Sequence, residues 1–123
     1  YRYVDVAIMR TIPKDNILEM MLMFPKLKLL DSGFAYHLIE KDVDKGRGLK
    51  VAAQLMNVDV KNIAAIGDSQ NDIEMLQVAG YRVALANAPS KLKDLADYVA
   101  VEEDGEGFAE VAQKIISTVR EEL

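Results

Sequence analysis

Hydrophobic residues are spaced differently in the two parts of the chain. Over residues 1–40, short apolar runs predict strands at 4–9, 27–30 and 34–39, with a helix between the first two. Thr11 and Pro13 are expected to open that helix as its cap and first-turn residue, and Pro25 to end it. Residues 1–40 are therefore predicted to form a small β-α-β-β unit.

From residue 41 onward, predicted strands alternate with amphipathic helices. The wholly apolar run 63–66 predicts a buried parallel strand, and two more strands are predicted at 81–85 and 98–101. Gly105 and Gly107 are expected to mark a turn before the last helix. Helices are predicted after Asp44, from about Ser69, over 89–95, and along the apolar stripe Phe108, Val111, Ala112, Ile115 and Val119. The α-β-α-β-α-β-α order predicts an α/β fold with a doubly wound, Rossmann-like parallel sheet, whose ligands bind beyond the carboxyl ends of the strands.

Composition narrows the classes of function. The 123 residues carry 15 Lys and Arg against 20 Asp and Glu, a net charge of −5, which argues against general nucleic-acid binding. With no cysteine and one histidine, disulfides, thiol nucleophiles and multi-histidine metal sites are excluded. No run of about 18 apolar residues and no secretory signal is present, so we expect a cytoplasmic protein without a membrane partner.

The segment Gly67-Asp68-Ser69-Gln70-Asn71-Asp72 carries the clearest candidate chemistry. Asp68 follows the predicted buried strand, and Asp72 lies four residues on, on the same face of the next helix. Two carboxylates at this place suit Mg²⁺, which prefers oxygen ligands. A capping box formed by Ser69 and Asp72 is an equally good interpretation of those two residues, but it does not account for Asp68 and Asn71.

Lys45 is the second candidate. It falls in the first turn of the helix after Asp44, where the helix amides attract anions, so lysine and amides together would clamp a phosphate. The alternative is a solvated lysine that pairs with Asp42 or Asp44. His37, on a predicted strand, is expected to be packed or solvated rather than catalytic.

Taken together, these motifs resemble the haloacid-dehalogenase (HAD) superfamily of phosphatases. Within it, the sequence is similar to the branch with an α/β cap, and there to archaeal-type phosphoglycolate phosphatases. The resemblance covers about residues 30–123. The matching segments are Val43-Asp44-Lys45-Gly46, Gly67 to Leu76, Ala86-Asn87-Ala88, Ala96-Asp97-Tyr98-Val99 and Gly105-Glu106-Gly107.

The resemblance implies that residues 1–40 are the C-terminal part of a cap and residues 41–123 the C-terminal half of an HAD-like core. It implies a magnesium-dependent phosphomonoester hydrolase, acting on 2-phosphoglycolate through an aspartyl-phosphate. Lys45 would contact the transferring phosphate as a catalytic and substrate-binding residue. Asn71 would support the phosphate or the loop. Asp68 would ligate Mg²⁺, and Asp72 would be a second ligand or would hold a metal-bound water.

The sequence lacks the family's nucleophile element, an Asp-x-Asp-x-Thr type motif. Because the chain begins at Tyr1 rather than Met, we expect that element in a segment upstream. The expected partners are a small phosphorylated metabolite and the N-terminal half of the same enzyme, in the same or a separate chain, with a homodimer as a further option. The alternatives are a sugar-phosphate phosphatase of the same superfamily, a non-catalytic phosphate- or metal-binding module, and a receiver-like module, in which the lysine should follow the acids rather than precede them.

Overall fold

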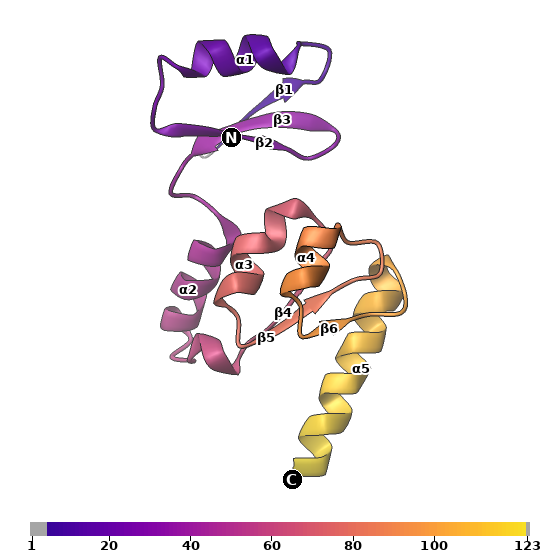
Figure 1. The fold of residues 1–123 in the computed structure, drawn as a ribbon. Coiled ribbons are helices and arrows are strands. Elements are labelled where there is room, and N and C mark those ends of the chain that lie inside the picture. The colour runs from indigo at the N-terminus through magenta and orange to yellow at the C-terminus, as the bar shows by residue number, and fades with distance from the viewer. Residues whose placement is uncertain (1–4, 123) are drawn as a thin grey trace. The chain divides into compact units, whose positions relative to one another are not determined.

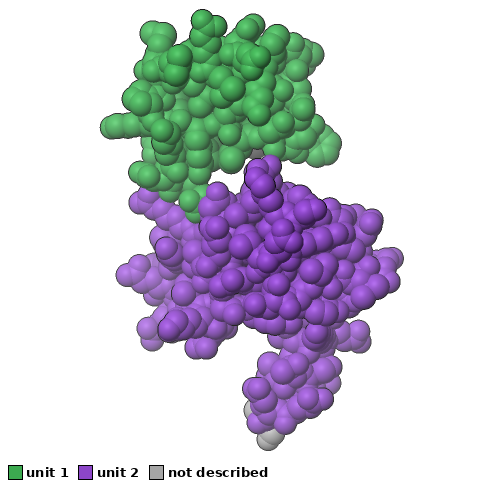
Figure 2. Space-filling model, in the orientation of Figure 1, with its two compact units in different colours: residues 1–44 green, residues 45–123 purple. Residues whose placement is uncertain are grey.

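The computed structural model of the protein describes residues 5–122. The expected strand start at Val4 and the chain start at Tyr1 lie outside these residues. Contacts along the chain separate two compact units, residues 1–44 and residues 45–123 (Figure 2). The boundary after residue 40 and the identification of the first part as a cap stay predictions.

The first unit is a three-stranded antiparallel sheet with one helix (Figure 1). Its elements are β1 (Asp5–Met9), α1 (Lys14–Met21), β2 (Leu27–Asp31) and β3 (Ala35–Glu40), and the sheet order is β1-β3-β2. Ile8 pairs with Tyr36, and Leu29 with Leu38, which places these four side chains on one face of the sheet. Ile17 of α1 and Tyr36 of β3 are both buried. The β-α-β-β order predicted from the sequence is confirmed for the described residues.

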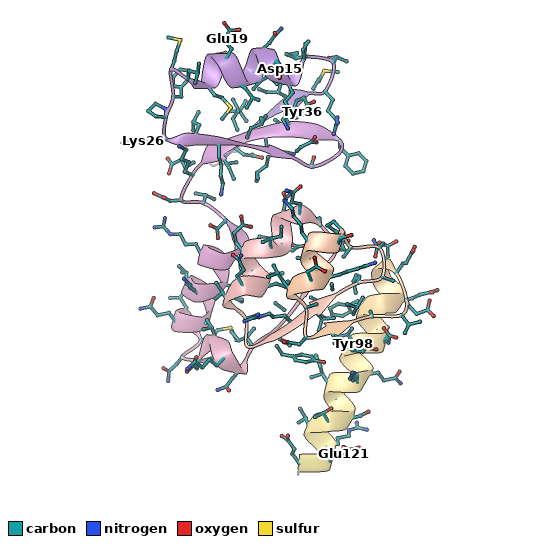
Figure 3. All side chains as sticks on the ribbon, viewed as in Figure 1. Asp15, Glu19, Lys26, Tyr36, Tyr98 and Glu121 are labelled. Atoms are coloured by element: carbon teal, nitrogen blue, oxygen red, sulfur yellow. The ribbon has the colours of Figure 1, made fainter. Side chains whose placement is uncertain are left out.

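Helix α1 begins differently from the expectation. Pro13, not Thr11, is the N-cap residue, and no side chain caps the helix. The N–H of Ile12 donates to the carbonyl of Met9, so a turn already holds Thr11 when the helix begins. The outer side of α1 is polar, because Asp15 and Glu19 point away from the sheet (Figure 3).

The second unit is a parallel α/β sheet. Its elements are α2 (Lys45–Leu55), the 3-10 turn η1 (Val60–Asn62), β4 (Ala64–Gly67), the 3-10 turn η2 (Gln70–Asp72), α3 (Ile73–Val78), β5 (Tyr81–Ala84), α4 (Ser90–Leu95), β6 (Tyr98–Val99) and α5 (Asp104–Glu122). The strands lie in the order β4-β5-β6, and both pairs are parallel. The predicted α/β fold with a parallel sheet is therefore confirmed.

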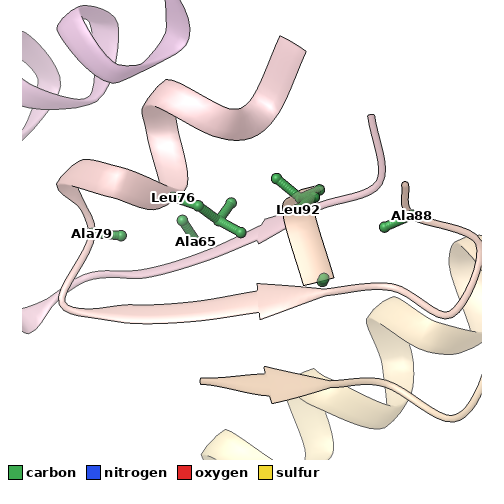
Figure 4. Close-up of a cluster of buried hydrophobic side chains, with 6 residues drawn as sticks. Ala65, Leu76, Ala79, Ala88 and Leu92 are labelled. Carbon is green, nitrogen blue, oxygen red and sulfur yellow. The ribbon is translucent and has the colours of Figure 1, made fainter. Parts of the chain in front are cut away.

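Hydrophobic residues pack on both faces of this sheet. On one face, Ala65 of β4 lies in a cluster with residues of α3 and α4 (Figure 4). On the other face, Ile66 of β4 packs against a cluster that contains Val83 of β5 and Val111 of α5. Consecutive residues of β4 thus enter opposite cores, as expected for a strand with helices on both sides. The first cluster consists of Ala65, Leu76, Ala79, Ala84, Ala88 and Leu92.

The helix expected from about Ser69 starts there, with Ser69 as its N-cap residue, but its first turn is a 3-10 turn and the α-helix begins at Ile73. The expected turn at the two glycines before the last helix was wrong. Gly105 and Gly107 lie inside α5 rather than in a turn before it. A Cβ atom on Gly107 would stand 2.5 Å from the carbonyl oxygen of Glu102 and 3.0 Å from Leu85 Cδ2, so this glycine permits close packing. The chain turns instead at Asp104, whose φ is +47°.

None of the helices formed by the described residues is long and apolar enough to span a membrane.

Candidate active site

The candidate site is built where β4 ends. Gly67 is the last residue of β4, and the chain turns there through Asp68 and Ser69 into η2. Asp72 folds back against the strand end, because a Cβ on Gly67 would lie only 2.6 Å from Asp72 Cβ. Asp72 is 4% exposed and is the buried charged residue of the described chain. A glycine at position 67 is therefore what allows a carboxylate to be buried at this strand end.

Backbone groups of the turn hold one oxygen of that carboxylate. Asp72 Oδ2 accepts hydrogen bonds from the N–H of Asp68 at 3.0 Å and of Ser69 at 3.1 Å. The hydroxyl of Ser69 lies 3.4 Å from the same oxygen. In a capping box, a side chain in the first turn accepts from the backbone N–H of the residue before the turn. Asp72 makes this contact with Ser69. The capping interpretation of these two residues is therefore correct as geometry, and it also arranges the turn around Asp68.

Lys45 holds the other oxygen. Its Nζ donates to Asp72 Oδ1 at 2.5 Å, although the two residues are 27 positions apart. The lysine side chain is 56% exposed, whereas that of Asp72 is 5% exposed. Lys45 is the first residue of α2, and α2 packs against α3 within the same unit. The packing of these two helices thus brings a cation to the carboxyl end of β4, and the exposed side of Lys45 can meet an anion from solvent.

Asp72 stays ionised in spite of its burial. Burial by itself raises the pKa of a carboxyl group. For Asp72, the hydrogen bond from Lys45, the two backbone N–H groups and the charge of Lys45 outweigh burial, so the pKa is lower than the ordinary value of 3.8. Asp72 is therefore a carboxylate at neutral pH.

Asp68 and Asn71 complete the set predicted from the sequence. Asp68 is exposed, and Asn71 is half-buried in η2, one residue before Asp72. The turn thus brings Asp68, Asn71 and Asp72 to one strand end together with Lys45. Within residues 5–122, no group of three His, Cys, Asp or Glu side chains is arranged to hold a metal ion. The oxygen donors present suit Mg²⁺ as part of a shell, because this ion keeps waters and binds substrate phosphate besides one or two carboxylates.

His37 has partners that its sequence position does not reveal. Its Nδ1 lies 3.0 Å from Asp5 Oδ2, and its Nε2 lies 3.1 Å from Ser32 Oγ. Ser32 is also bonded to the backbone of Ala35 in the turn between β2 and β3. The expectation of a packed histidine agrees with this arrangement, in which His37 ties β1 to the β2–β3 turn.

A second pair that sequence reasoning missed joins the loops after β5 and β6. Asn87 Nδ2 donates to Asp104 Oδ1 at 2.9 Å, and the N–H of Asp104 donates to Asn87 Oδ1 at 3.3 Å. The two-way bond steadies Asp104 in its left-handed conformation, which is uncommon for a residue other than glycine.

The sequence of the chain matches a known family. Residues 22–111 match the family model of haloacid dehalogenase-like hydrolases, and the chain belongs to this family. The matched residues include β2 and β3 of the first unit and the whole parallel sheet with the acidic turn after β4.

The chain is also similar to particular proteins of known name or structure. The chain is 38% identical over 115 residues to a protein named phosphoglycolate phosphatase from Methanothermobacter thermautotrophicus, covering 94% of this chain and 52% of that protein. A protein of the same name from Archaeoglobus fulgidus is 49% identical over 87 residues, covering 71% and 39%. The crystal structure of Thermoplasma acidophilum 0175 superimposes with a TM-score of 0.81 at 23% identity, covering 93% of this chain and 51% of that one. The chain spans about half the length of the curated relatives it matches, or less.

Proposed function

We propose that this chain is the C-terminal half of a magnesium-dependent phosphomonoester hydrolase whose substrate is 2-phosphoglycolate. The observation that carries the proposal is the Lys45–Asp72 pair, which stands beside Asp68 at the carboxyl end of β4. Ligands of parallel α/β sheets bind at this place. Membership of a hydrolase family and relatives named phosphoglycolate phosphatase support the reaction and the substrate.

Each residue has a role that its surroundings support. Lys45, paired through one proton with Asp72 and half exposed, binds the phosphate with its remaining N–H groups and is the catalytic cation. Asn71 binds the phosphate or steadies the loop. Asp68 and Asp72 hold Mg²⁺, directly or through a water. The bound ion supplies neutralisation of the negative charge on the phosphate oxygens.

Both carboxylate oxygens of Asp72 already accept hydrogen bonds, which leaves few lone pairs for a metal ion. Lys45 occupies one of its oxygens, and the turn amides occupy the other. Asp68 is exposed at the same turn and has its whole carboxylate to offer. We therefore assign direct ligation to Asp68 first, and to Asp72 the orientation of Lys45 and of the turn together with an outer contact to the ion.

We assign the nucleophile to the N-terminal half of the relatives, which this chain does not match. That half would supply an aspartate that accepts the phosphoryl group, and water would then cleave the aspartyl-phosphate. Residues 1–40 would end a cap domain, and residues 41–123 would complete the core. The partners of the chain are then a small phosphorylated metabolite and the N-terminal half of the enzyme.

The test is to produce this chain together with the unmatched N-terminal half of the Methanothermobacter relative and to measure phosphate release. We expect hydrolysis of 2-phosphoglycolate that stops when EDTA removes Mg²⁺ and returns when Mg²⁺ is added. Faster release from a sugar phosphate would replace the proposed substrate by the alternative class. An associated but inactive pair, with the intact relative active under the same conditions, would overturn the proposed function.

A further inference from the structure

A row of three polar side chains lies in the first unit, outside the candidate site. His37 of β3 has a partner on each ring nitrogen: Nδ1 lies 3.0 Å from Asp5 Oδ2, and Nε2 lies 3.1 Å from Ser32 Oγ. The side chains of His37 and Asp5 are 21% and 17% exposed, and Ser32 is half-buried. A hydroxyl beside a base that a third group orients is the usual arrangement of an activated nucleophile. The proposed phosphatase function uses none of these three residues.

The partners of the imidazole determine where its protons lie. A carboxylate can only accept, so the ring nitrogen that faces Asp5, Nδ1, carries a proton. In a neutral imidazole Nε2 is then the acceptor, and the hydroxyl of Ser32 is the donor beside it. The backbone of Ala35 gives a second constraint. Its carbonyl, 3.1 Å from Ser32 Oγ, already accepts from the N–H of Ser32, so the hydroxyl proton can point at Nε2.

The N–H of Ala35 also acts on the serine oxygen. It donates to Ser32 Oγ at 3.2 Å. A donor at this place stabilises the negative charge that develops on the oxygen when its proton leaves. Ser32 thus has a base on one side and a fixed backbone donor on another.

An open hollow adjoins the serine and the histidine. Its volume is about 490 Å³, in the range of small-molecule sites, and its apolar lining comes from Ala7, Met9, Phe34 and Ala35. Ala7 is paired directly with His37 across β1 and β3, and Ala35 is bonded to Ser32. Met9 and Phe34 are 71% and 93% exposed, so the apolar wall is accessible from solvent. Such a wall suits a short acyl chain.

We propose that Ser32 is a nucleophile that takes the acyl group of a small activated carboxylic ester, with His37 as its general base and Asp5 as a positioning residue. Ser32 Oγ bonds to the carbonyl carbon while its proton passes to His37 Nε2. The bond from that carbon to the leaving oxygen then breaks, and the leaving oxygen takes the proton. Water, deprotonated by His37, afterwards cleaves the acyl-serine to a carboxylic acid and the free hydroxyl.

The turn limits the rate of this reaction. Three of its N–H groups, those of Ser32, Gly33 and Ala35, already donate within the turn. A rapid esterase needs donors aimed at the oxyanion of the tetrahedral intermediate. We therefore expect slow acylation by reactive donors and accumulation of the acyl-serine rather than rapid turnover.

A fluorophosphonate probe tests the nucleophile directly. An activated serine displaces fluoride from the phosphorus of the probe and stays labelled, and mass spectrometry of the 123-residue chain locates the label. We expect Ser32 to react at least tenfold faster than Ser117, an exposed serine whose hydroxyl donates to a carbonyl of its own helix. With p-nitrophenyl butyrate, a burst of nitrophenolate should leave a butyryl group on Ser32.

Variants separate an activating role of His37 from a structural one. His37→Ala should slow the labelling of Ser32 at least tenfold, and added imidazole should restore part of the rate, which a purely structural role does not predict. Ser117→Ala is the matched control and should leave the labelling of Ser32 unchanged. Circular dichroism checks that each variant is folded.

Asp5 is tested through its effect on the imidazole. Asp5→Asn should slow the labelling of Ser32 at least tenfold, because an amide can donate to Nδ1 as well as accept and no longer fixes the proton there. Asp5→Glu keeps a group that only accepts, so it should lose less of the rate.

Two outcomes would overturn the inference. Ser32 could react no faster than Ser117, or the labelling of Ser32 could be unchanged in folded His37→Ala. The three side chains would then serve only to tie β1 to the β2–β3 turn. If the variants at positions 5 and 37 unfold, the comparison of Ser32 with Ser117 in the unmodified chain decides. Phosphate release by the assembled enzyme is a separate measurement, so failure of the proposed function would leave this inference standing.

Discussion

Asp72 determines the geometry of the candidate site more than any other described residue. Its two oxygens join three parts of the second unit: the start of α2 through Lys45, the turn after β4 through two amides, and η2, to which it belongs. Burial makes each of these bonds more important, because a buried carboxylate that lacks partners is strongly unfavourable. The residue therefore serves stability and site geometry together.

Replacing Asp72 by asparagine should destabilise the chain. The amide keeps the shape but loses the charge, and its NH₂ group cannot accept from either Lys45 or the turn amides. Because Lys45 is largely exposed, we expect a loss of about 1–3 kcal/mol in the free energy of unfolding rather than the value for a fully buried pair. Urea denaturation at pH 7 measures it. The control Asp68→Asn, at an exposed position, should change stability by less than about 0.5 kcal/mol, and equal effects would refute the argument.

The same carboxyl group should make stability depend on pH. Its pKa in the folded protein lies below the ordinary value of 3.8, so the folded state favours the ionised form. The stabilisation is therefore complete above that ordinary value and is lost as pH falls through the lower, folded value. Denaturation of the unmodified chain and of Asp72→Asn across pH 7 to 2 should give a difference that shrinks at the acidic end. A constant difference would contradict the pKa direction.

At the scale of elements, the end of β4 depends on a glycine. We expect Gly67→Ala to cost about 1–3 kcal/mol, because the new methyl group would stand 2.6 Å from Asp72 Cβ and the buried carboxylate would have to move. Gly48→Ala is a matched control, since it lies inside α2 with no atom within 4 Å of the new Cβ. It should stabilise the helix by about 0.5–1 kcal/mol. Thermal unfolding followed by circular dichroism compares the two, and a destabilising effect at both positions would contradict this account.

Periodicity predicted the elements well where burial repeats along the chain. The apolar run that became β4 was found because both of its sides face a core, and the stripe that became α5 because one side of that helix does. Helix starts were predicted less well. The glycines of α5 indicated a turn, which was wrong. Gly107 is a glycine because a carbonyl of the preceding loop and a leucine side chain distant in sequence lie close to it. The composition of a segment does not reveal such close contacts.

The candidate site was predictable only in part for a similar reason. Asp68, Asn71 and Asp72 are neighbours in sequence, so their motif brings them together whatever the rest of the chain does. The pairing of Lys45 with Asp72 spans 27 residues and depends on α2 packing against α3. From the sequence alone, Asp42 and Asp44 were equally plausible partners for Lys45, because they are its neighbours in the chain. Which carboxylate Lys45 meets is a property of the tertiary fold.

At the scale of the whole molecule, the proposed phosphate clamp lies in this chain, and the proposed nucleophile lies in the half of the relatives that the chain does not match. Lys45 and the acids lie at the open side of a three-stranded sheet. The matched region makes up about half the length of the Methanothermobacter relative. A phosphoryl group is transferred mainly by positioning and charge neutralisation, so a cation at this place matters only when the nucleophile is also present. The activity of Lys45 variants must therefore be measured in the assembled enzyme.

Lys45→Met in that assembly is expected to lower the rate of 2-phosphoglycolate hydrolysis by about 10²–10³-fold, the usual effect of losing one group that neutralises charge in the transition state. Initial rates at saturating substrate and Mg²⁺ measure it. Lys50→Met is the matched control, because it removes an exposed lysine from the same helix. It should leave the rate within about twofold, since Lys50 is solvated and, five residues along a helix of about 3.6 residues per turn, lies on a different side of α2 from Lys45. If both variants lose activity equally, the effect is one of net charge. If neither does, Lys45 serves only to neutralise Asp72, and the catalytic cation must come from the other half of the enzyme.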